Sequence, residues 1–301
     1  MQIESIKRVE PDRDAASPFD FSTSISALGR NFTAELCEAL VKGPIRQCEV
    51  HPDQLKDAGE SGMRQHARLR KLVAEGGLAV SSLHLPYWDE WDISNLDEGV
   101  RRGAVNGQIE LARPYLDLKP RLLTLHSGAE PVTAAERPYR MEQSVKSIRA
   151  LSAFAAANGM AVALEFLPRS CLGNHEDELL ELAAPYKVDE VGVCLDVNHV
   201  MARAAELPQI IGRLAPRLLS AHISDYDGID ECHWLPGRGV IDWPAVVQAL
   251  CRVPRRLTLI YETTSRVENV GALQFLRAIE ECHEQVLGRL ARECQLCNGK
   301  S

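Results

Sequence analysis

The stretch MAVALEFLPRSCLGNHEDELLELAAPYKVDEVGVCLDVNH, residues 160–199, decides the fold. It begins and ends with short apolar runs, 160–168 and 191–199, whose length suits buried strands. Between them, residues 177–186 place leucines at helical spacing. A strand, a helix and a second strand form a βαβ unit with parallel strands. Because both runs are almost continuously apolar, helices are expected to cover both faces of the sheet.

The same alternation extends along most of the chain. Six further apolar runs occur at FSTSI (21–25), IRQCEV (45–50), LAVSSLHLPY (78–87), RLLTLHSG (121–128), LLSAHISD (218–225) and RLTLIYET (256–263). Eight such units within about 260 residues predict a single-domain (β/α)8 TIM barrel. A doubly wound open sheet is the structural alternative, but the chain contains no GxGxxG or GxxxxGK[ST] loop of the kind that commonly marks it.

The predicted domain organisation follows from this pattern. Residues 1–20 are polar and rich in Pro and Asp, so we expect a lead-in there; the barrel covers 21–290 and a tail covers 291–301. The sequence has no apolar run long enough to span a membrane. Its N-terminus carries charges of both signs and lacks the apolar core of a secretory signal. A cytoplasmic location is therefore expected.

Charge and cysteine content narrow the function further. The net charge is −8, from 34 basic and 42 acidic residues. This balance disfavours a protein whose main partner is nucleic acid or an anionic membrane, since both require a basic face. The nine cysteines are irregularly spaced and odd in number, which predicts reduced thiols. Cys294 and Cys297 form a lone CxxC, which we interpret as part of a frayed tail.

Polar side chains gather where the predicted strands end. They are Glu49, His51, His84, His126, Glu165, Asp196, His199, His222, Asp225 and Glu262. In a barrel, the C-terminal ends of all strands meet at one mouth, where active sites are built. We therefore expect these side chains to surround a common site.

Four of these residues form a candidate metal site. Glu165 and Glu262 lie within apolar runs, and no Arg or Lys is placed to neutralise them. An unpaired buried carboxylate is costly, so a bound cation is the expected partner. Glu165, Asp196, His222 and Glu262 come from four successive predicted strands. This mixture of carboxylates and one imidazole predicts one divalent metal ion, namely Mn²⁺, Mg²⁺, Co²⁺, Fe²⁺ or Zn²⁺.

Several motifs in this order resemble a known family. They are ALEF (163–166), CLDVNH (194–199), HISDYDG (222–228), HWLPGRGVIDW (233–243) and YET (261–263). Together they resemble the xylose-isomerase-like TIM barrels, which include sugar isomerases, ketose 3-epimerases, inosose dehydratases and the family 2 apurinic endonucleases. The resemblance extends from about Phe21 to about Leu290.

The resemblance implies roles for individual residues. Glu165, Asp196, His222 and Glu262 match the metal ligands of the isomerase and epimerase branch. Glu165 and Glu262 also match the two carboxylates that move a proton on and off a substrate carbon. His199 matches a histidine that contacts substrate oxygens. The implied substrate is a small sugar or polyol, and the implied assembly is a homo-oligomer.

Further residues are candidates for substrate binding. His84, His126 and His233 are expected to hold hydroxyl groups, as histidines at such positions do in sugar-directed relatives. Trp88 follows the third predicted strand and is expected to stack on a sugar ring. Arg238 lies in a glycine-flanked turn, where it can hold a phosphate or carboxylate.

Two catalytic alternatives share these residues. A metal-dependent dehydratase or lyase of a keto-polyol uses the same groups. An endonuclease of the resembled family holds three zinc ions, and most of its ligands are matched by His84, His126, Glu165, Asp196, His199, His222, His233 and Glu262. Glu231 would have to replace an Asp there. The acidic charge of the chain and of the segment 51–62 disfavours DNA binding. A non-catalytic scaffold is disfavoured because all four ligands are present.

Overall fold

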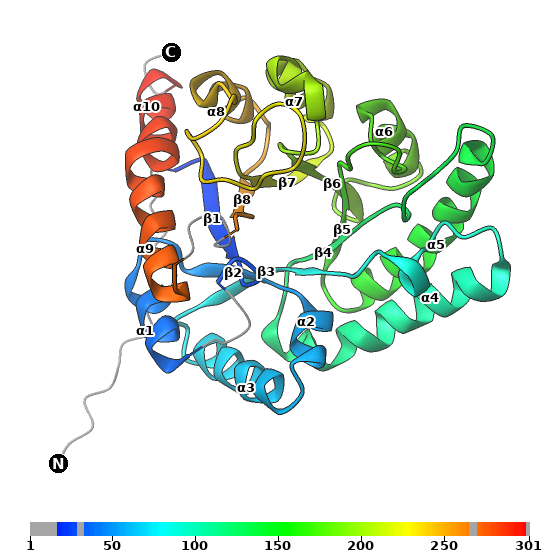
Figure 1. Cartoon of the computed structure of the whole chain (residues 1–301), viewed down its shortest axis with the longest axis horizontal. Coiled ribbons are helices and arrows are strands. Elements are labelled where there is room, and N and C mark those ends of the chain that lie inside the picture. Colours follow the sequence, from blue (N-terminus) through cyan, green and yellow to red (C-terminus); the bar gives the residue numbers. More distant parts are fainter. Residues whose placement is uncertain (1–16, 29–32, 265–269, 299–301) are drawn as a thin grey trace.

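The eight predicted strands form a closed parallel barrel (Figure 1). The computed structural model describes residues 17–28, 33–264 and 270–298. The strands are β1 (Phe19–Ser24), β2 (Gln47–Val50), β3 (Ala79–His84), β4 (Leu122–Leu125), β5 (Ala161–Glu165), β6 (Val191–Asp196), β7 (Leu218–Ile223) and β8 (Leu257–Tyr261). Each strand pairs with the next, and β1 pairs with β8 from Phe19 opposite Leu257 to Thr23 opposite Tyr261. The predicted (β/α)8 barrel is confirmed.

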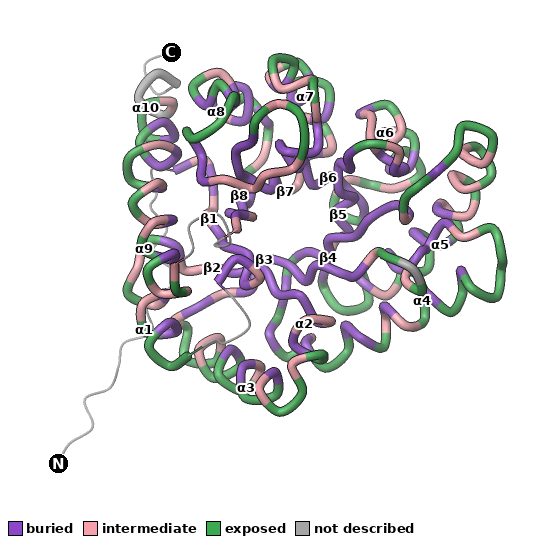
Figure 2. Tube along the Cα trace, in the orientation of Figure 1, coloured by how far each residue is buried: buried purple, intermediate pink, exposed green. Residues whose placement is uncertain are grey.

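Helices surround the barrel on the outside. They are α1 (Ala34–Lys42), α2 (Pro52–Asp57), α3 (Glu60–Ala74), α4 (Glu98–Ala112), α5 (Arg137–Ala157), α6 (Glu176–Ala183), α7 (Leu207–Leu214), α8 (Trp243–Leu250), α9 (Ala272–Cys282) and α10 (Gly288–Asn298). Short helical turns add η1 (Asp89–Trp91), η2 (Arg113–Leu118), η3 (Met201–Glu206) and η4 (His283–Leu287). Figure 2 shows the buried chain concentrated in the strands and the exposed chain on the outer helices. In the described ranges, no helix is both long and apolar enough to cross a membrane.

Local sequence signals set where helices begin. In α8, the Asp242 side chain accepts a hydrogen bond from the backbone N–H of Ala245, and Pro244 lies in the first turn. These are the expected features of a helix start. The helix then buries Trp243 and Val247 against the barrel. This helix follows the loop after β7 and so anchors the end of that loop.

Alternation along the strands separates a supporting layer from a polar layer. Side chains two residues apart on a strand point to the same face. Ala163 and Cys194 form a small buried apolar cluster with Leu122, separate from the main core. Two residues further along β5 and β6 come Glu165 and Asp196. The strand period thus places the carboxylates one layer above an apolar floor, at the C-terminal mouth.

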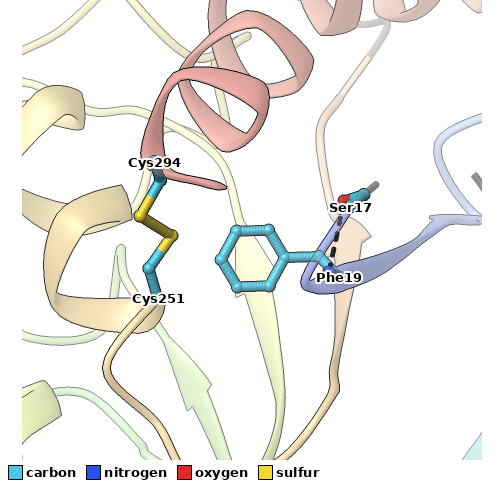
Figure 3. Close-up of a disulfide and its surroundings, with 4 residues drawn as sticks. All are labelled: Ser17, Phe19, Cys251 and Cys294. Atoms are coloured by element: carbon cyan, nitrogen blue, oxygen red, sulfur yellow. Dashed lines mark hydrogen bonds between the residues drawn. A yellow bond between two sulfur atoms is a disulfide. The ribbon is translucent and has the colours of Figure 1, made fainter. Parts of the chain in front are cut away.

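One expectation about the cysteines is wrong. Cys251, which follows α8, and Cys294 in α10 form a disulfide (Figure 3). The two helices pack together, which brings residues 43 positions apart to a Cα separation of 6.8 Å, and the sequence pattern does not reveal this packing. The described free thiols are Cys37, Cys48, Cys171, Cys194, Cys232 and Cys282.

Both expected terminal segments lie partly outside the described ranges. Residues 1–16 of the expected lead-in and 299–301 of the expected tail lie outside the described ranges. Helix α10 extends across the boundary expected at residue 290.

Candidate metal centre

The four predicted metal ligands lie together at the mouth of the barrel. Glu165 ends β5, Asp196 ends β6, His222 lies in β7 and Glu262 directly follows β8. The strand register places Asp196 directly opposite His222. One ligand atom from each of the four side chains lies within 4.8 Å of the others. The distance is short enough for a single ion to contact all four.

The geometry around His222 fits a cation better than a hydrogen-bond network. Its Nδ1 atom lies 2.9 Å from Oε2 of Glu262, 3.3 Å from Oε1 of Glu165 and 3.9 Å from Oδ2 of Asp196. Oε2 of Glu262 and Oδ2 of Asp196 are buried and have no hydrogen-bond partner. Buried carboxylate oxygens without donors are costly unless an ion binds them. The residues present therefore fit a divalent metal.

Electrostatics supports the same interpretation. Burial raises the pKa of Asp196 to about 7, and the charge of Glu262 acts in the same direction. A nearby cation favours the ionised form of a carboxyl group and would reverse this rise. The other oxygen of Asp196, Oδ1, accepts a hydrogen bond from the backbone N–H of Asn198 at 2.7 Å, which fixes the orientation of the carboxylate.

Glu165 stands between two groups of imidazoles. Its Oε2 atom lies 2.9 Å from Nε2 of His84 and 3.0 Å from Nε2 of His126. Its Oε1 atom faces His222. His84, Glu165 and His222 also satisfy the distances of a metal-binding group. The predicted proximity of these side chains is therefore present in the structure.

A third group of possible ligands lies beside the first. His199 bonds through Nδ1 to the carbonyl oxygen of Phe166, and His233 bonds through Nδ1 to the carbonyl oxygen of Glu262. These contacts leave both Nε2 atoms facing Oε2 of Glu231, at 3.6 and 3.8 Å. Glu231 lies in the acidic loop after β7, away from the strand ends, so the pattern of polar strand ends does not reveal it.

A cavity of about 140 Å³ opens above the centre. The predicted site residues that line it are His84, Trp88, His126, Glu165, His199, His233 and Glu262. The other lining residues are Ser26, His51, Asp53, Gln54, Leu85, Pro86, Tyr87 and Glu231. The ring of Tyr87 stacks on His126 with the centroids 3.7 Å apart, whereas Trp88 is 48% exposed at the rim. His51, which its place at a strand end predicts to lie at the mouth, lines the cavity as well.

Arg238 is the predicted substrate-binding residue that does not line this cavity. It is exposed in the loop after β7, and its charge acts on Cys282 at the end of α9. The orientation follows from the buried Asp225, which accepts hydrogen bonds from the backbone N–H groups of Gly237 and Ile241 and from the indole of Trp243. These bonds fold the loop back on itself and leave Arg238 outside.

The fold and the polar mouth together define a class of barrel, and comparison with known proteins identifies it. The chain belongs to the xylose isomerase-like TIM barrel family, whose model matches residues 44–281. A curated relative, the uncharacterized protein y4fM of Sinorhizobium fredii (strain NBRC 101917 / NGR234), is 25% identical over 242 residues, which are 71% of this chain and 76% of the relative.

Solved structures agree with the fold. An L-ribulose 3-epimerase superposes with a TM-score of 0.72 at 19% identity, covering 93% of this chain and 98% of that one. The IolI protein, solved with a bound zinc atom, gives a TM-score of 0.70 at 18% identity and covers 90% and 99% of the two chains. Other sugar 3-epimerases are also among the structural neighbours.

Proposed function

We propose that this protein is a divalent-metal-dependent isomerase or epimerase that moves a proton next to the carbonyl of a sugar or sugar derivative. The observation that carries the proposal is the group of Glu165, Asp196, His222 and Glu262, of which the first three are buried and Glu165 and Glu262 line a cavity. The similarity in fold to sugar epimerases supports the same class of reaction.

The proposed mechanism assigns the metal to those four side chains. When bound, a divalent ion polarises a substrate carbonyl and lowers the cost of negative charge on its oxygen. Glu165 and Glu262 are the proposed proton acceptor and donor, since both carboxylates line the cavity. His84, His126 and His199 lie around the same space and are suited to bind hydroxyl oxygens of the substrate.

The outcome of proton removal depends on where the proton returns. Return to a different carbon gives an isomerase, and return to the opposite face of the same carbon gives an epimerase. Loss of a β-hydroxyl group instead gives a dehydratase of a keto-polyol, which remains the alternative within this chemistry. All three reactions use the same carboxylates, so the products must be identified directly.

Two measurements test the proposal in sequence. Elemental mass spectrometry on protein purified without chelator or affinity metal should give about one Mn, Mg, Co, Fe or Zn per chain. The metal-loaded protein should then exchange the carbon-bound proton of a ketose with D₂O, as followed by NMR with L-ribulose, D-tagatose and inososes. Absence of metal binding, or metal binding without exchange on any of these compounds, would contradict the proposal.

A second candidate is a zinc phosphodiesterase with up to three ions. The specific observation in its favour is the presence of three groups of possible ligands, two of which share Glu165 and His222. Against it, Arg169 donates a 2.5 Å hydrogen bond to Oε1 of Glu231 and so already supplies one positive charge there. Two or three Zn per chain, with cleavage of an oligonucleotide containing an abasic site, would establish this candidate instead.

A further inference from the structure

Glu49 is a buried carboxylate, and the proposed mechanism assigns no role to it. It lies in β2 and is fully inaccessible to solvent. In the described part of the chain, its close side-chain partners are hydroxyl groups and imidazoles, without a Lys or Arg. Burying an ionised carboxylate is costly. A role in the site would explain why this position holds one.

The two oxygens of Glu49 have different surroundings. Oε2 accepts hydrogen bonds from the hydroxyl groups of Ser82, at 2.7 Å, and Thr124, at 3.4 Å. The same oxygen lies 3.3 Å from Nε2 of His222. Oε1 has no hydrogen-bond partner, and its near neighbour is Nε2 of His51 at 3.8 Å. The hydroxyl groups therefore hold the carboxylate with Oε2 directed at His222.

We propose that Glu49 is a positioning residue, which fixes His222 so that its Nδ1 atom is available to a metal held with Glu165, Asp196 and Glu262. The proposal rests on the proposed metal-dependent function and deepens it. A carboxylate accepts hydrogen bonds but cannot donate one when ionised. The bond to Glu49 therefore keeps a proton on Nε2 of His222. Nδ1, which faces Oε2 of Glu262 at 2.9 Å and Oε1 of Glu165 at 3.3 Å, would then bind the cation in place of a proton.

A second contact holds the plane of the same ring. The imidazole of His84 stacks on that of His222 with centroids 5.6 Å apart and an angle of 18° between the planes. Stacking opposes tilting of the ring, and the bond to Glu49 opposes rotation within its plane. A carboxylate behind a metal-binding histidine also makes the imidazole a stronger ligand, and loss of such partners typically weakens metal binding by about 10–100-fold.

A purely structural role predicts a different environment. Glu176 is another buried glutamate, and it has strong cationic partners: Arg203 binds both of its oxygens at 3.0 Å and Arg213 binds one at 2.7 Å. Glu49 has no such partner and leaves one oxygen unsatisfied. For folding alone, a neutral side chain of the same shape at position 49 would serve as well or better.

The test compares metal affinity with the stability of the metal-free protein. Glu49→Gln keeps the shape and the bond to Ser82, and Glu49→Leu removes both the charge and the hydrogen bonds. Mn²⁺ and Zn²⁺ affinities are measured by competition with a chelating dye, and the Co²⁺ absorption spectrum reports the ligand set. We expect binding 10–100-fold weaker in Glu49→Gln and weaker still in Glu49→Leu. The melting temperature of metal-free Glu49→Gln should equal or exceed that of the wild type.

Glu176→Gln is the matched control, because it alters a buried carboxylate far from His222 in the sequence and bonded to arginines. It should lower the melting temperature and leave metal affinity unchanged. Metal affinity of both Glu49 variants within twofold of the wild type would overturn the inference and leave the proposed function standing. A wild-type protein that binds none of these ions would overturn the proposed function itself, and the inference with it.

Discussion

The carboxylate of Glu165 is held in place by several contacts of single side chains. Its oxygens lie near imidazoles from four different strands or their ends, namely β3, β4, β6 and β7. These contacts hold the carboxylate in one orientation with 1% of the residue exposed. A group held this firmly is suited to take a proton from a substrate carbon at a fixed distance. Glu262 is more accessible, with 19% of its side chain exposed, and its Oε2 atom faces the same Nδ1 atom of His222 as Oε1 of Glu165.

Loss of either carboxylate alone is expected to impair catalysis. Glu165→Gln or Glu262→Gln should reduce proton exchange with D₂O by about 10²–10⁴-fold, since each removes one general acid–base group. Circular dichroism should show an unchanged fold. Full activity in either variant would exclude a mechanism that uses both carboxylates.

His84 and His126 are expected to bind the substrate, and His84 affects the metal site only indirectly, by stacking on the ring of His222. Replacing both by alanine should raise KM for the sugar about tenfold or more, because hydrogen bonds to its hydroxyl groups are lost. The metal content should remain near one ion per chain by elemental mass spectrometry. Loss of two or more metal equivalents would instead support the phosphodiesterase with several zinc ions.

At the scale of elements, the loop between β7 and α8 does most to shape the site. The loop carries Glu231 and His233 to the mouth, and Asp225 gathers its two ends through buried hydrogen bonds. Gly239 lies where the loop returns, and a Cβ atom there would overlap the Tyr226 carbonyl oxygen. Much of the motif 222–243 therefore serves to fix the conformation of this loop.

Gly239→Ala should displace this loop. We expect a loss of about 1–3 kcal/mol of stability from the overlap, together with weaker substrate binding. Thermal melts and KM measure the two effects. Gly212→Ala is the control, since Gly212 lies in α7 with no atom near the added methyl group, and it should be neutral or stabilising. Equal behaviour of the two variants would show that the loop tolerates the change.

Glu176 provides a pH test at the same scale, because it joins α6 to η3 and α7 through Arg203 and Arg213. Burial opposes ionisation, but hydrogen bonds from Arg203 outweigh it and lower the pKa of Glu176 from 4.5 to about 2. A lowered pKa stabilises the fold above pH 4.5, and this contribution disappears as the pH falls toward 2. Glu176→Gln should therefore cost about 2 kcal/mol at pH 7. Denaturant unfolding should show the difference vanishing near pH 2, and a difference that is constant with pH would contradict the assignment.

For the whole molecule, the sequence predicts the barrel and the four ligands because both depend on local patterns. Charged residues inside apolar runs, such as Glu165, are conspicuous without a structure. The contact between Glu49 and His222 is different, since β2 and β7 are not neighbours and meet only across the closed barrel. The outward position of Arg238 depends on bonds made by Asp225, and the Cys251–Cys294 disulfide depends on how two outer helices pack.

The closed barrel would also make the proposed metal binding a property of the whole fold. The four proposed ligands come from four consecutive strands, β5 to β8, so one ion would connect half of the barrel. A ligand that binds only the folded state stabilises it by about 2.7 kcal/mol at a free concentration of 100 Kd. In a chain of this size, that corresponds to a rise in Tm of about 5 °C.

Thermal melts test this expectation. After removal of metal by EDTA and dialysis, melts with increasing Mn²⁺ or Zn²⁺ should show a rise in Tm that grows with the logarithm of metal concentration. A variant with Asp196→Asn should lose most of this rise, whereas melts of the wild type that do not respond to metal would show that these strands are not joined by an ion.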